Sequence, residues 1–170
     1  MTYSTTQGIT LRPYEPADAI ATLAVFTEAI TQTAAAYYTA GQIEAWAKPG
    51  RRDPNAWNDA MRGRGSVVAV AGIEVVGFSD VDRDGHIDML FVSPRYLRRG
   101  IARTLLSHIE HRAQATGTKL LSSDVSKAAR PFFESMGFDL VREQRATMEG
   151  MELTNYRMTK TLTPPSAIVR

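Results

Sequence analysis

The residues best suited to bind a ligand are Arg98-Arg99-Gly100-Ile101-Ala102, which join an apolar strand to an amphipathic helix. The first N–H groups of a helix have no partner within the helix, and they carry the positive end of its dipole. The arginines add positive charge, and Gly100 would let a ligand approach the backbone closely. These features favour a small anion such as phosphate. The sequence therefore predicts a phosphate-binding turn at this join.

A candidate proton acceptor lies a few residues earlier, in a strand predicted over 86–92. Alternation gives this strand two faces, one with His86, Asp88 and Leu90 and the other with Ile87, Met89 and Phe91. A carboxylate or imidazole beside an amine could act as a general base or orient the amine. Simpler interpretations stay open: Asp88 could be solvated or paired with an arginine, and His86 could be a surface histidine beside a turn.

The length and composition fit one globular domain. The chain has 170 residues, of which 44% are hydrophobic and 22% are charged, and this is enough to bury a core. It has no cysteine, which excludes a disulfide, a thiolate zinc site and a cysteine nucleophile, and which fits a reducing cytoplasm. We expect residues 1–160 to form the domain and residues 161–170 to form a C-terminal tail.

Membranes, nucleic acids and metals are less favoured partners. No apolar run suggests a membrane span, and the opening MTYSTTQG lacks the features of a signal peptide. The net charge is only +2, and Tyr96 is the only aromatic residue among the arginines at 95–103, so a nucleic-acid surface is a weaker interpretation than a small-anion site. His108 and His111 have no third ligand nearby in the sequence, so we expect no metal site.

The hydrophobic pattern predicts an α+β protein. Thr39 with Gln42 resembles a helix capping box, and Asp53 before Pro54 is typical of a helix start. Residues 1–8 are expected to form a loose start. The predicted strands are 9–12, 66–71, 75–81, 86–92, 119–125, 138–148 and 151–160. The predicted helices are 17–31, 40–47, one that begins after Asp53, one from Ile101 that stops at Gly117, and 126–136.

Two segments resemble the GCN5-related N-acetyltransferase (GNAT) family. Residues 97–102, Leu-Arg-Arg-Gly-Ile-Ala, are similar to the Q/R-x-x-G-x-G/A pattern of its acetyl-CoA-binding turn. Residues 126–138 resemble a later family motif that ends in two aromatic residues, three others, and Gly-Phe. The tracts 37–46 and 87–92 further resemble the bacterial YafP-type branch. The two motifs in order, on the expected elements, are much more specific than either one alone.

The resemblance implies a GNAT-like mixed, splayed sheet of about seven strands with helices on both faces. Acetyl-CoA would be the cosubstrate, with its pantetheine arm on the backbone of the 86–92 strand and its pyrophosphate on the N–H groups of the arginine-rich turn. A strand N–H would polarise the thioester carbonyl. The residues implied to bind the cofactor are Leu90, Phe91, Val92, Arg98, Arg99, Gly100, Ile101, Ala102, Arg103, Ser126 and Phe132.

This sequence departs from the family pattern at two positions. Leu97 stands where the family has Gln or Arg, so any pyrophosphate contact there must come from the backbone. Phe133 stands where many members have a tyrosine that protonates the departing thiolate, and a phenyl ring cannot donate a proton. Tyr38 or Tyr156 could replace that tyrosine, or the thiolate could depart directly to solvent.

The resemblance leads us to expect an enzyme that transfers the acetyl group directly to a primary amine, with Asp88 as base or orienting group. A small-molecule acceptor is preferred over a peptide or protein amine. Tyr37, Tyr38, Gln42 and Trp46 would lie in the helical region that shapes the acceptor pocket, with an aromatic wall from the tyrosines and Trp46, although Trp46 could simply be helix core. The alternative is a CoA-binding sensor with little catalysis. We also expect a cytoplasmic location and a possible homodimer that pairs through the hairpin at 138–160.

Overall fold

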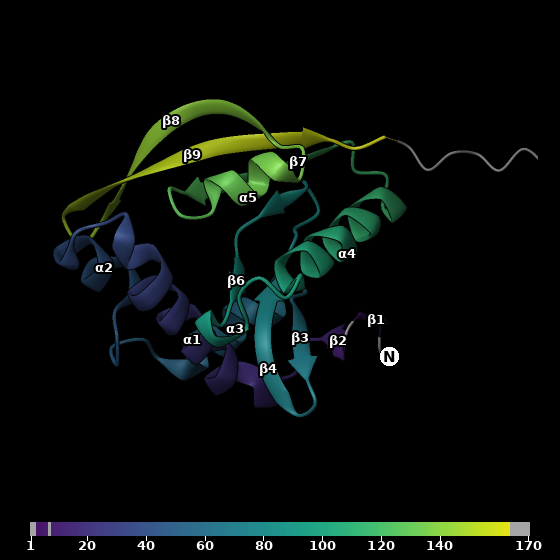
Figure 1. Ribbon diagram of the computed structural model, residues 1–170, viewed down its shortest axis with the longest axis horizontal. Coiled ribbons are helices and arrows are strands. Elements are labelled where there is room, and N and C mark those ends of the chain that lie inside the picture. The colour runs from purple at the N-terminus through teal and green to yellow at the C-terminus, as the bar shows by residue number, and fades with distance from the viewer. Residues whose placement is uncertain (1–2, 7, 164–170) are drawn as a thin grey trace, which may run out of the picture.

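The computed structural model describes residues 3–6 and 8–163, which form two sheets with helices on both faces (Figure 1). The first sheet has the order β1-β2-β3-β4-β6, and the second has the order β5-β7-β9-β8. The strands are β1 Tyr3–Thr6, β2 Ile9–Pro13, β3 Val67–Ala71, β4 Glu74–Ser79, β5 His86–Ile87, β6 Leu90–Val92, β7 Leu120–Ser126, β8 Asp139–Met148 and β9 Met151–Thr161.

Local signals explain where several helices begin. Thr39 and Gln42 form the predicted capping box at the start of α2, and the Asp53 side chain accepts a hydrogen bond from the Asn55 N–H at the start of α3. The α-helices are α1 Ala19–Glu28, α2 Ala40–Ala47, α3 Pro54–Gly63, α4 Ile101–Ala115 and α5 Arg130–Ser135. Short helical turns at Pro16–Asp18, Ala29–Thr33 and Ala34–Ala36 flank α1, and another lies at Pro94–Tyr96.

Two hydrophobic clusters cover the two faces of the sheets. On one face, α4 contributes Leu105, Leu106 and Ile109 to a buried cluster that also contains Phe133 of α5. On the other face, α1 contributes Phe26 to a cluster with side chains of α2 and α3. The expected α+β class and the helices on both faces are therefore confirmed.

The predicted strand 86–92 divides in the middle. Its first half, β5, pairs in parallel with β7, and its second half, β6, pairs antiparallel with β4. The two sheets diverge from this point, as the resemblance implied (Figure 1). The described residues form nine strands rather than about seven, because this strand counts twice and β1 occupies part of the expected loose start.

The divided strand also breaks the alternation that the sequence suggested. Ile87 packs in the same cluster as Leu90 and Val92, whereas Met89 and Phe91 pack against the opposite cluster. The prediction that Ile87 shares a face with Met89 and Phe91 was therefore wrong. An irregular step at 88–89 changes the side to which each later residue points.

Two further expectations change at the ends of the chain. The stretch Pro16–Ala36 has the length and composition of a helix that could cross a membrane, which was not anticipated. In this structure its buried residues include Asp18, paired with Arg12 at 2.7 Å, as well as core residues such as Phe26. At the other end, β9 extends to Thr161 and Leu162 is buried, so the tail cannot begin at 161. Residues 164–170 of the predicted tail lie outside the described part of the chain.

Candidate active site

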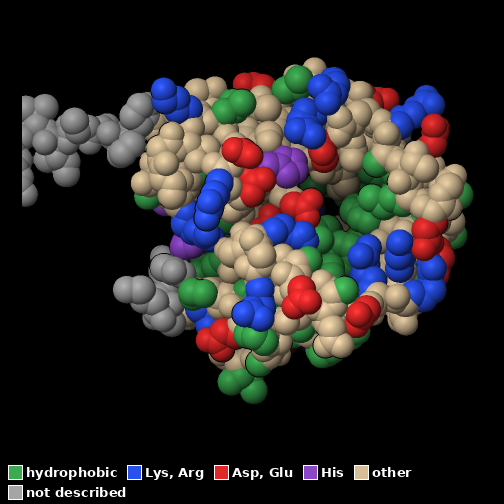
Figure 2. All heavy atoms as spheres, turned by 180° about the vertical axis from the view of Figure 1, so that it is seen from behind, with side chains coloured by type: hydrophobic (Ala, Val, Ile, Leu, Met, Phe, Trp, Pro, Cys, Tyr) green, Lys and Arg blue, Asp and Glu red, His purple; other side chains and the backbone are tan. Residues whose placement is uncertain are grey.

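A cavity of about 520 Å³ opens where the two sheets diverge. Its walls come from β6, the far end of β7, the helical turn Ala29–Thr33 and α5. Figure 2 shows a hollow with hydrophobic side chains inside it, acidic and histidine side chains on one side, and Lys or Arg side chains on the other. The cavity is lined by most of the sequence-predicted site residues, namely Tyr38, His86, Asp88, Leu90, Phe91, Val92, Ala102, Ser126 and Phe132.

The β6 backbone offers polar groups to this cavity. The Ser93 N–H donates to the Val76 carbonyl at 2.8 Å, and the Asp80 N–H donates to the Met89 carbonyl at 3.3 Å. Residues 89, 91 and 93 therefore turn their peptide groups toward β4, and alternation turns those of Leu90 and Val92 toward the divergence. The Phe91 backbone was expected to contact the cofactor, but it faces β4, so only Leu90 and Val92 are suitably directed.

A buried carboxylate that the sequence analysis missed holds the irregular step in place. Asp80 is only 1% exposed, and its Oδ1 accepts hydrogen bonds from the N–H groups of Asp88 at 2.9 Å and Met89 at 3.2 Å. Its Oδ2 lies 3.2 Å from Arg64 Nε, as an ion pair without the alignment of a hydrogen bond. Asp80 therefore fixes the place where the strand leaves one sheet and joins the other.

Burial raises the pKa of Asp80 to about 6. Loss of hydration is the main cause, and the two backbone N–H groups and Arg64 only partly offset it. A perturbed carboxylate beside a cavity is common in active sites. Asp80 lies at the end of the predicted strand 75–81, whereas Asp82 and Asp84 follow it, but no sequence signal indicated that Asp80 is buried beside the cavity.

The two proton-acceptor candidates both line the cavity, and each has a partner. Asp88 Oδ2 accepts a hydrogen bond from Arg64 Nη1 at 2.9 Å, yet the Asp88 side chain remains 49% exposed. His86 Nδ1 lies 3.0 Å from Ser122 Oγ. Arg64 therefore joins the carboxylates of Asp80 and Asp88, and Asp88 can still face an incoming molecule. Its catalytic role stays a prediction.

The two tyrosines proposed as proton donors differ in position. The Tyr38 hydroxyl donates to the Thr154 carbonyl at 2.8 Å and accepts from the Lys127 N–H at 2.9 Å, so its proton is already engaged. Burial raises the pKa of Tyr38, which keeps it protonated. Tyr156 does not line the cavity, and its ring lies 4.4 Å from the Arg130 guanidinium. Neither geometry favours a freely available acid.

The arginine-rich turn has the backbone shape of an anion site. Arg98 has φ 61° and Gly100 has φ 77°, so the chain turns sharply before α4 begins at Ile101. The Thr104 N–H is bonded to the Gly100 carbonyl, which leaves the N–H groups of the first three helical residues without a partner in the helix. The backbone at Arg98, Arg99, Gly100, Ile101, Ala102 and Arg103 thus has the shape expected of the cradle, and its binding of an anion stays a prediction.

Charge and packing both support this cradle. Among the described residues, no carboxylate lies within ion-pair distance of Arg98, Arg99 or Arg103, although Arg99 stacks on Tyr96 at 4.9 Å. A Cβ at Gly77 of β4 would lie only 3.2 Å from Ile101 Cγ2, so a glycine there lets the start of α4 rest directly on β4. The helix start therefore lies beside β6, and Ala102 lines the cavity of about 520 Å³ together with β6 residues.

The segment after β7 closes another side of the cavity. Ser126 Oγ accepts a hydrogen bond from the Ala129 N–H at 3.2 Å and so shapes the turn into α5. Phe132 and Phe133 both line the cavity, and their rings meet edge to face with centroids 5.7 Å apart. Phe133 is 3% exposed, so the residue that replaces the family tyrosine is packed into the wall.

The aromatic wall expected from the helices is present in part. Tyr38 and Trp46 line the cavity with ring centroids 5.6 Å apart, and Phe26 and Phe91 extend the wall. Trp46 is thus a lining residue as well as a partner of the core. Tyr37 does not line the cavity, and Gln42 Nε2 donates to the Glu152 carbonyl. Phe26 and Arg52 are lining residues that the sequence analysis did not single out.

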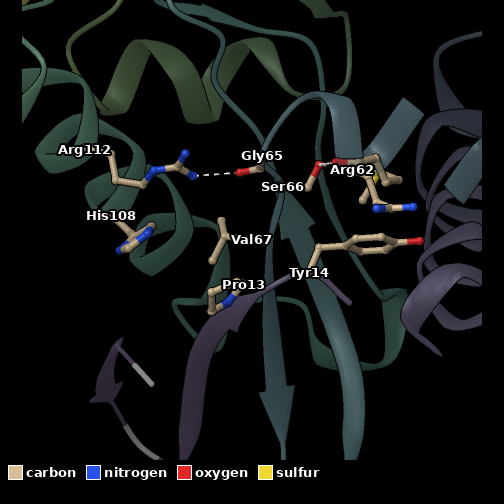
Figure 3. Close-up of a pocket in the computed structure, with 9 residues that line it drawn as sticks. Pro13, Tyr14, Arg62, Gly65, Ser66, Val67, His108 and Arg112 are labelled. Atoms are coloured by element: carbon tan, nitrogen blue, oxygen red, sulfur yellow. Dashed lines mark hydrogen bonds between the residues drawn. The ribbon is translucent and has the colours of Figure 1, made fainter. Parts of the chain in front are cut away.

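A second cavity of about 390 Å³ lies near the C-terminal half of α4 (Figure 3). Arg112 donates from Nη1 to the Gly65 carbonyl at 2.8 Å, and Ser66 Oγ donates to the Met61 carbonyl at 2.8 Å. His108 also lines this cavity, two helical turns after Ile101. The arginine-rich turn and the sheet divergence both adjoin the larger cavity, which is therefore the better candidate.

Comparison with known proteins identifies the family. Residues 33–160 match the family model described as an acetyltransferase (GNAT) domain. The chain is 38% identical over 152 residues to the uncharacterized N-acetyltransferase YafP of Escherichia coli (strain K12). The aligned region covers 89% of this chain and 95% of YafP.

Solved structures give the same result. The GCN5-related N-acetyltransferase from Rhodopseudomonas palustris has a TM-score of 0.88 and 34% identity, over 94% of this chain and 99% of that one. The protein yncA from Salmonella typhimurium, a putative acetyltransferase solved with its cofactor acetyl-CoA, has a TM-score of 0.68 and 20% identity, over 94% and 96% of the two chains, and shows the shared fold. The chain therefore belongs to the GCN5-related N-acetyltransferase family, in a YafP-like branch, and is an acyltransferase.

Proposed function

We propose that this enzyme transfers the acetyl group of acetyl-CoA directly to the primary amine of a small molecule. The observation that carries the proposal is the meeting of three features at one cavity: the free β6 edge at Leu90 and Val92, the anion cradle before α4, and the exposed carboxylate of Asp88. A cofactor with a pyrophosphate and an amide-containing arm matches the first two features. The third would serve the amine.

The geometry of the site supports acetyl-CoA as its ligand. A Cβ at Gly100 would meet nothing within 4 Å, so the space before the cradle is open to a ligand. The pyrophosphate would be held by the N–H groups of the cradle and by its arginines, which have no ion-pair partner in the part of the chain that the structure describes. The outward peptide groups of Leu90 and Val92 would hold the pantetheine arm as an added strand does. When bound, acetyl-CoA would supply the acetyl group as a reactive thioester.

The chain's residues have separate tasks in the reaction. The amine must lose a proton before it has a lone pair, and Asp88 is placed to accept that proton or orient the amine. The Leu90 N–H, the first after those held by Asp80, is placed to stabilise the oxygen that gains charge. The amine nitrogen then bonds to the acetyl carbon, the C–S bond breaks, and the sulfur leaves with the electron pair. The acylated nitrogen releases its remaining extra proton to solvent, which yields the neutral amide.

No tyrosine is needed to protonate that sulfur. Phe133 cannot donate a proton, and Tyr156 lies outside the cavity lining. The Tyr38 hydroxyl already donates its hydrogen bond to the Thr154 carbonyl. A thiol with an ordinary pKa of about 8.5 is a good leaving group near neutral pH. We therefore propose departure of the thiolate to solvent.

The proposal is tested by thiol release from acetyl-CoA with a panel of amines, amino acids, polyamines and peptides. Release that depends on an acceptor, with the acetylated amine found by mass spectrometry, is the expected result. Acetyl-CoA binding without turnover on any acceptor would support the alternative, a CoA-binding sensor. Turnover restricted to peptide or protein termini would contradict a small-molecule acceptor and identify a peptide or protein amine instead.

Replacing Gly100 by alanine is expected to weaken acetyl-CoA binding by about tenfold or more. The new methyl would occupy the open space before the cradle, and φ 77° would strain any residue with a Cβ. The matched control is Gly72→Ala in the β3–β4 hairpin, where φ is 62° and a Cβ also meets nothing within 4 Å. Calorimetric titration should show weak binding in the first variant only. Equal affinities in both would mean that the cradle does not hold the cofactor.

We also propose a cytoplasmic location, which the absence of cysteine favours, and assembly as a homodimer. The edge strand β8 exposes Leu140 and Val141 at 45% and 53%. Light scattering after size-exclusion chromatography would give the mass in solution. A monomeric mass across the working concentration range would contradict the proposed homodimer.

A further inference from the structure

The cavity contains one charged side chain that differs from the others. Asp88 pairs with Arg64, and Asp124 is bound by Arg157 through contacts of 2.6 and 2.9 Å. Arg52 also lines the cavity, yet among the described residues no carboxylate lies within ion-pair distance of it. The nearest acidic influence, Glu149, is itself paired with Arg51 and Lys48. Within residues 3–6 and 8–163, Arg52 is therefore a cation without an ion-paired carboxylate.

The Arg52 guanidinium is held in place by neutral groups. Nε donates to the Ala47 carbonyl at 3.1 Å and Nη2 donates to the Trp46 carbonyl at 2.7 Å, so one edge of the planar group closes the end of α2. Its carbon lies 4.6 Å from the centre of the Phe26 ring. The Nη1 edge has no hydrogen bond to a described residue. This leaves a fixed donor edge of the kind that binds a carboxylate.

Partial burial disfavours the charged form of Arg52 and so lowers its pKa, and Glu149 offsets this effect only in part. A carboxylate from a bound ligand would supply the missing negative charge. The adjoining surface is aromatic. The ring centroids of Phe26 and Phe91 lie 4.9 Å apart, and those of Trp46 and Phe91 lie 6.4 Å apart. A ligand held by Arg52 would therefore lay an apolar or aromatic body along this wall.

We propose that the acetyl acceptor is an amine that also carries a carboxylate, joined by an apolar or aromatic body. The carboxylate would bind Arg52, the body would contact Phe26, Trp46 and Phe91, and the amine would approach Asp88. This proposal rests on the proposed function, since it names the acceptor for the same site. It assigns Arg52 as the residue that selects the acceptor by charge.

The test compares each acid with its neutral amide. 6-Aminohexanoate and 6-aminohexanamide, and 4-(aminomethyl)benzoate and 4-(aminomethyl)benzamide, in which the body lies between the amine and the acid or amide, are assayed for kcat/KM in the wild type and in Arg52→Gln. An acid and its amide also differ in the basicity of the amine, so the readout is the change in the acid-to-amide ratio between the two proteins. We expect the wild type to prefer at least one acid and Arg52→Gln to lower that ratio by about 10- to 100-fold.

Two further variants separate selection from folding. Arg51→Gln removes the adjacent arginine, whose partners Glu44 and Glu149 lie outside the cavity lining, and it should leave the ratio unchanged. Arg52→Lys keeps the charge and should retain part of the preference. Damage to the end of α2 would lower the rates for acid and amide alike and would not change their ratio.

Each outcome decides one question. An acid-to-amide ratio that is the same in the wild type and Arg52→Gln, or a wild type that prefers every amide, would overturn the role of Arg52 while leaving the acetyltransferase proposal intact. Turnover on none of the amines in this set or the wider panel would instead contradict the proposed function.

Discussion

Replacing Asp88 by asparagine is expected to lower kcat by about 100-fold or more, because a positioned base contributes about 10²- to 10⁴-fold to such a reaction. The asparagine keeps the shape of the side chain and can still accept a hydrogen bond from Arg64, but it cannot take a proton. Acetyl-CoA affinity should change by less than about twofold, since the β6 edge and the cradle are untouched. Steady-state kinetics with calorimetric titration of acetyl-CoA would measure both.

The matched control is Asp124→Asn, because Asp124 lines the same cavity from β7 and is also bound to an arginine. Its two oxygens are occupied by Arg157, and Oδ1 also accepts from Gln144, so it is less available than Asp88. A large loss of kcat in Asp124→Asn, together with a normal kcat in Asp88→Asn, would identify Asp124 of β7 as the base instead. Normal turnover in both variants would mean that solvent accepts the proton of the amine and that Asp88 does not take part in the mechanism.

The backbone shape of the turn proposed to hold the cofactor was predictable because its signals are local. A helix start with a glycine and several arginines needs only neighbouring residues to create an anion cradle, and φ 77° at Gly100 agrees with that expectation. The capping box of α2 and the glycine turns of the hairpins are local in the same way. These signals place α4 after the divided strand and so locate the cradle next to it.

The division of the strand at 88–89 was not predictable in detail. Strand alternation assumes that one partner follows the whole strand, whereas here β7 pairs with one half and β4 with the other. The step depends on Asp80, which binds two N–H groups eight and nine positions later in the chain. Asp80 falls at the end of the predicted strand 75–81, but no local signal shows that it is buried and binds later N–H groups while Asp82 and Asp84 are exposed.

The acceptor half depends on contacts between distant segments. Arg52 reaches the cavity by bonding to the end of α2 and stacking on Phe26, and Arg64 reaches Asp88 from the end of α3. The helical turn Ala29–Thr33 has i to i+5 pairing and supplies Ala29, Ile30 and Thr33 to the wall. Such wide turns often occur at functional sites. Their positions follow from tertiary packing, which explains why this part of the site was only outlined from the sequence.

The stability of the fold should depend on pH through Asp80 by about 3 kcal/mol. Its pKa is about 6 in the folded protein, against 3.8 as its ordinary value. Between these two pH values the folded state holds the Asp80 proton and the unfolded state does not. This contribution therefore raises the free energy of unfolding as the pH falls from about 6 to 3.8, and above pH 6 the buried charge carries its full cost.

Asp80→Asn isolates this effect because every other titratable group is shared with the wild type. An asparagine oxygen can still accept from the N–H groups of Asp88 and Met89, so the divided strand should be retained. Denaturant unfolding at about pH 4.5, 6 and 7.5 should show the wild type gaining stability relative to the variant as the pH falls. Asp84→Asn, in the exposed part of the same turn, should run parallel to the wild type. A difference between wild type and Asp80→Asn that is constant with pH would mean that Asp80 titrates at the same pH in both states, and the carboxylate at the divergence would then be a structural anchor without a proton of its own.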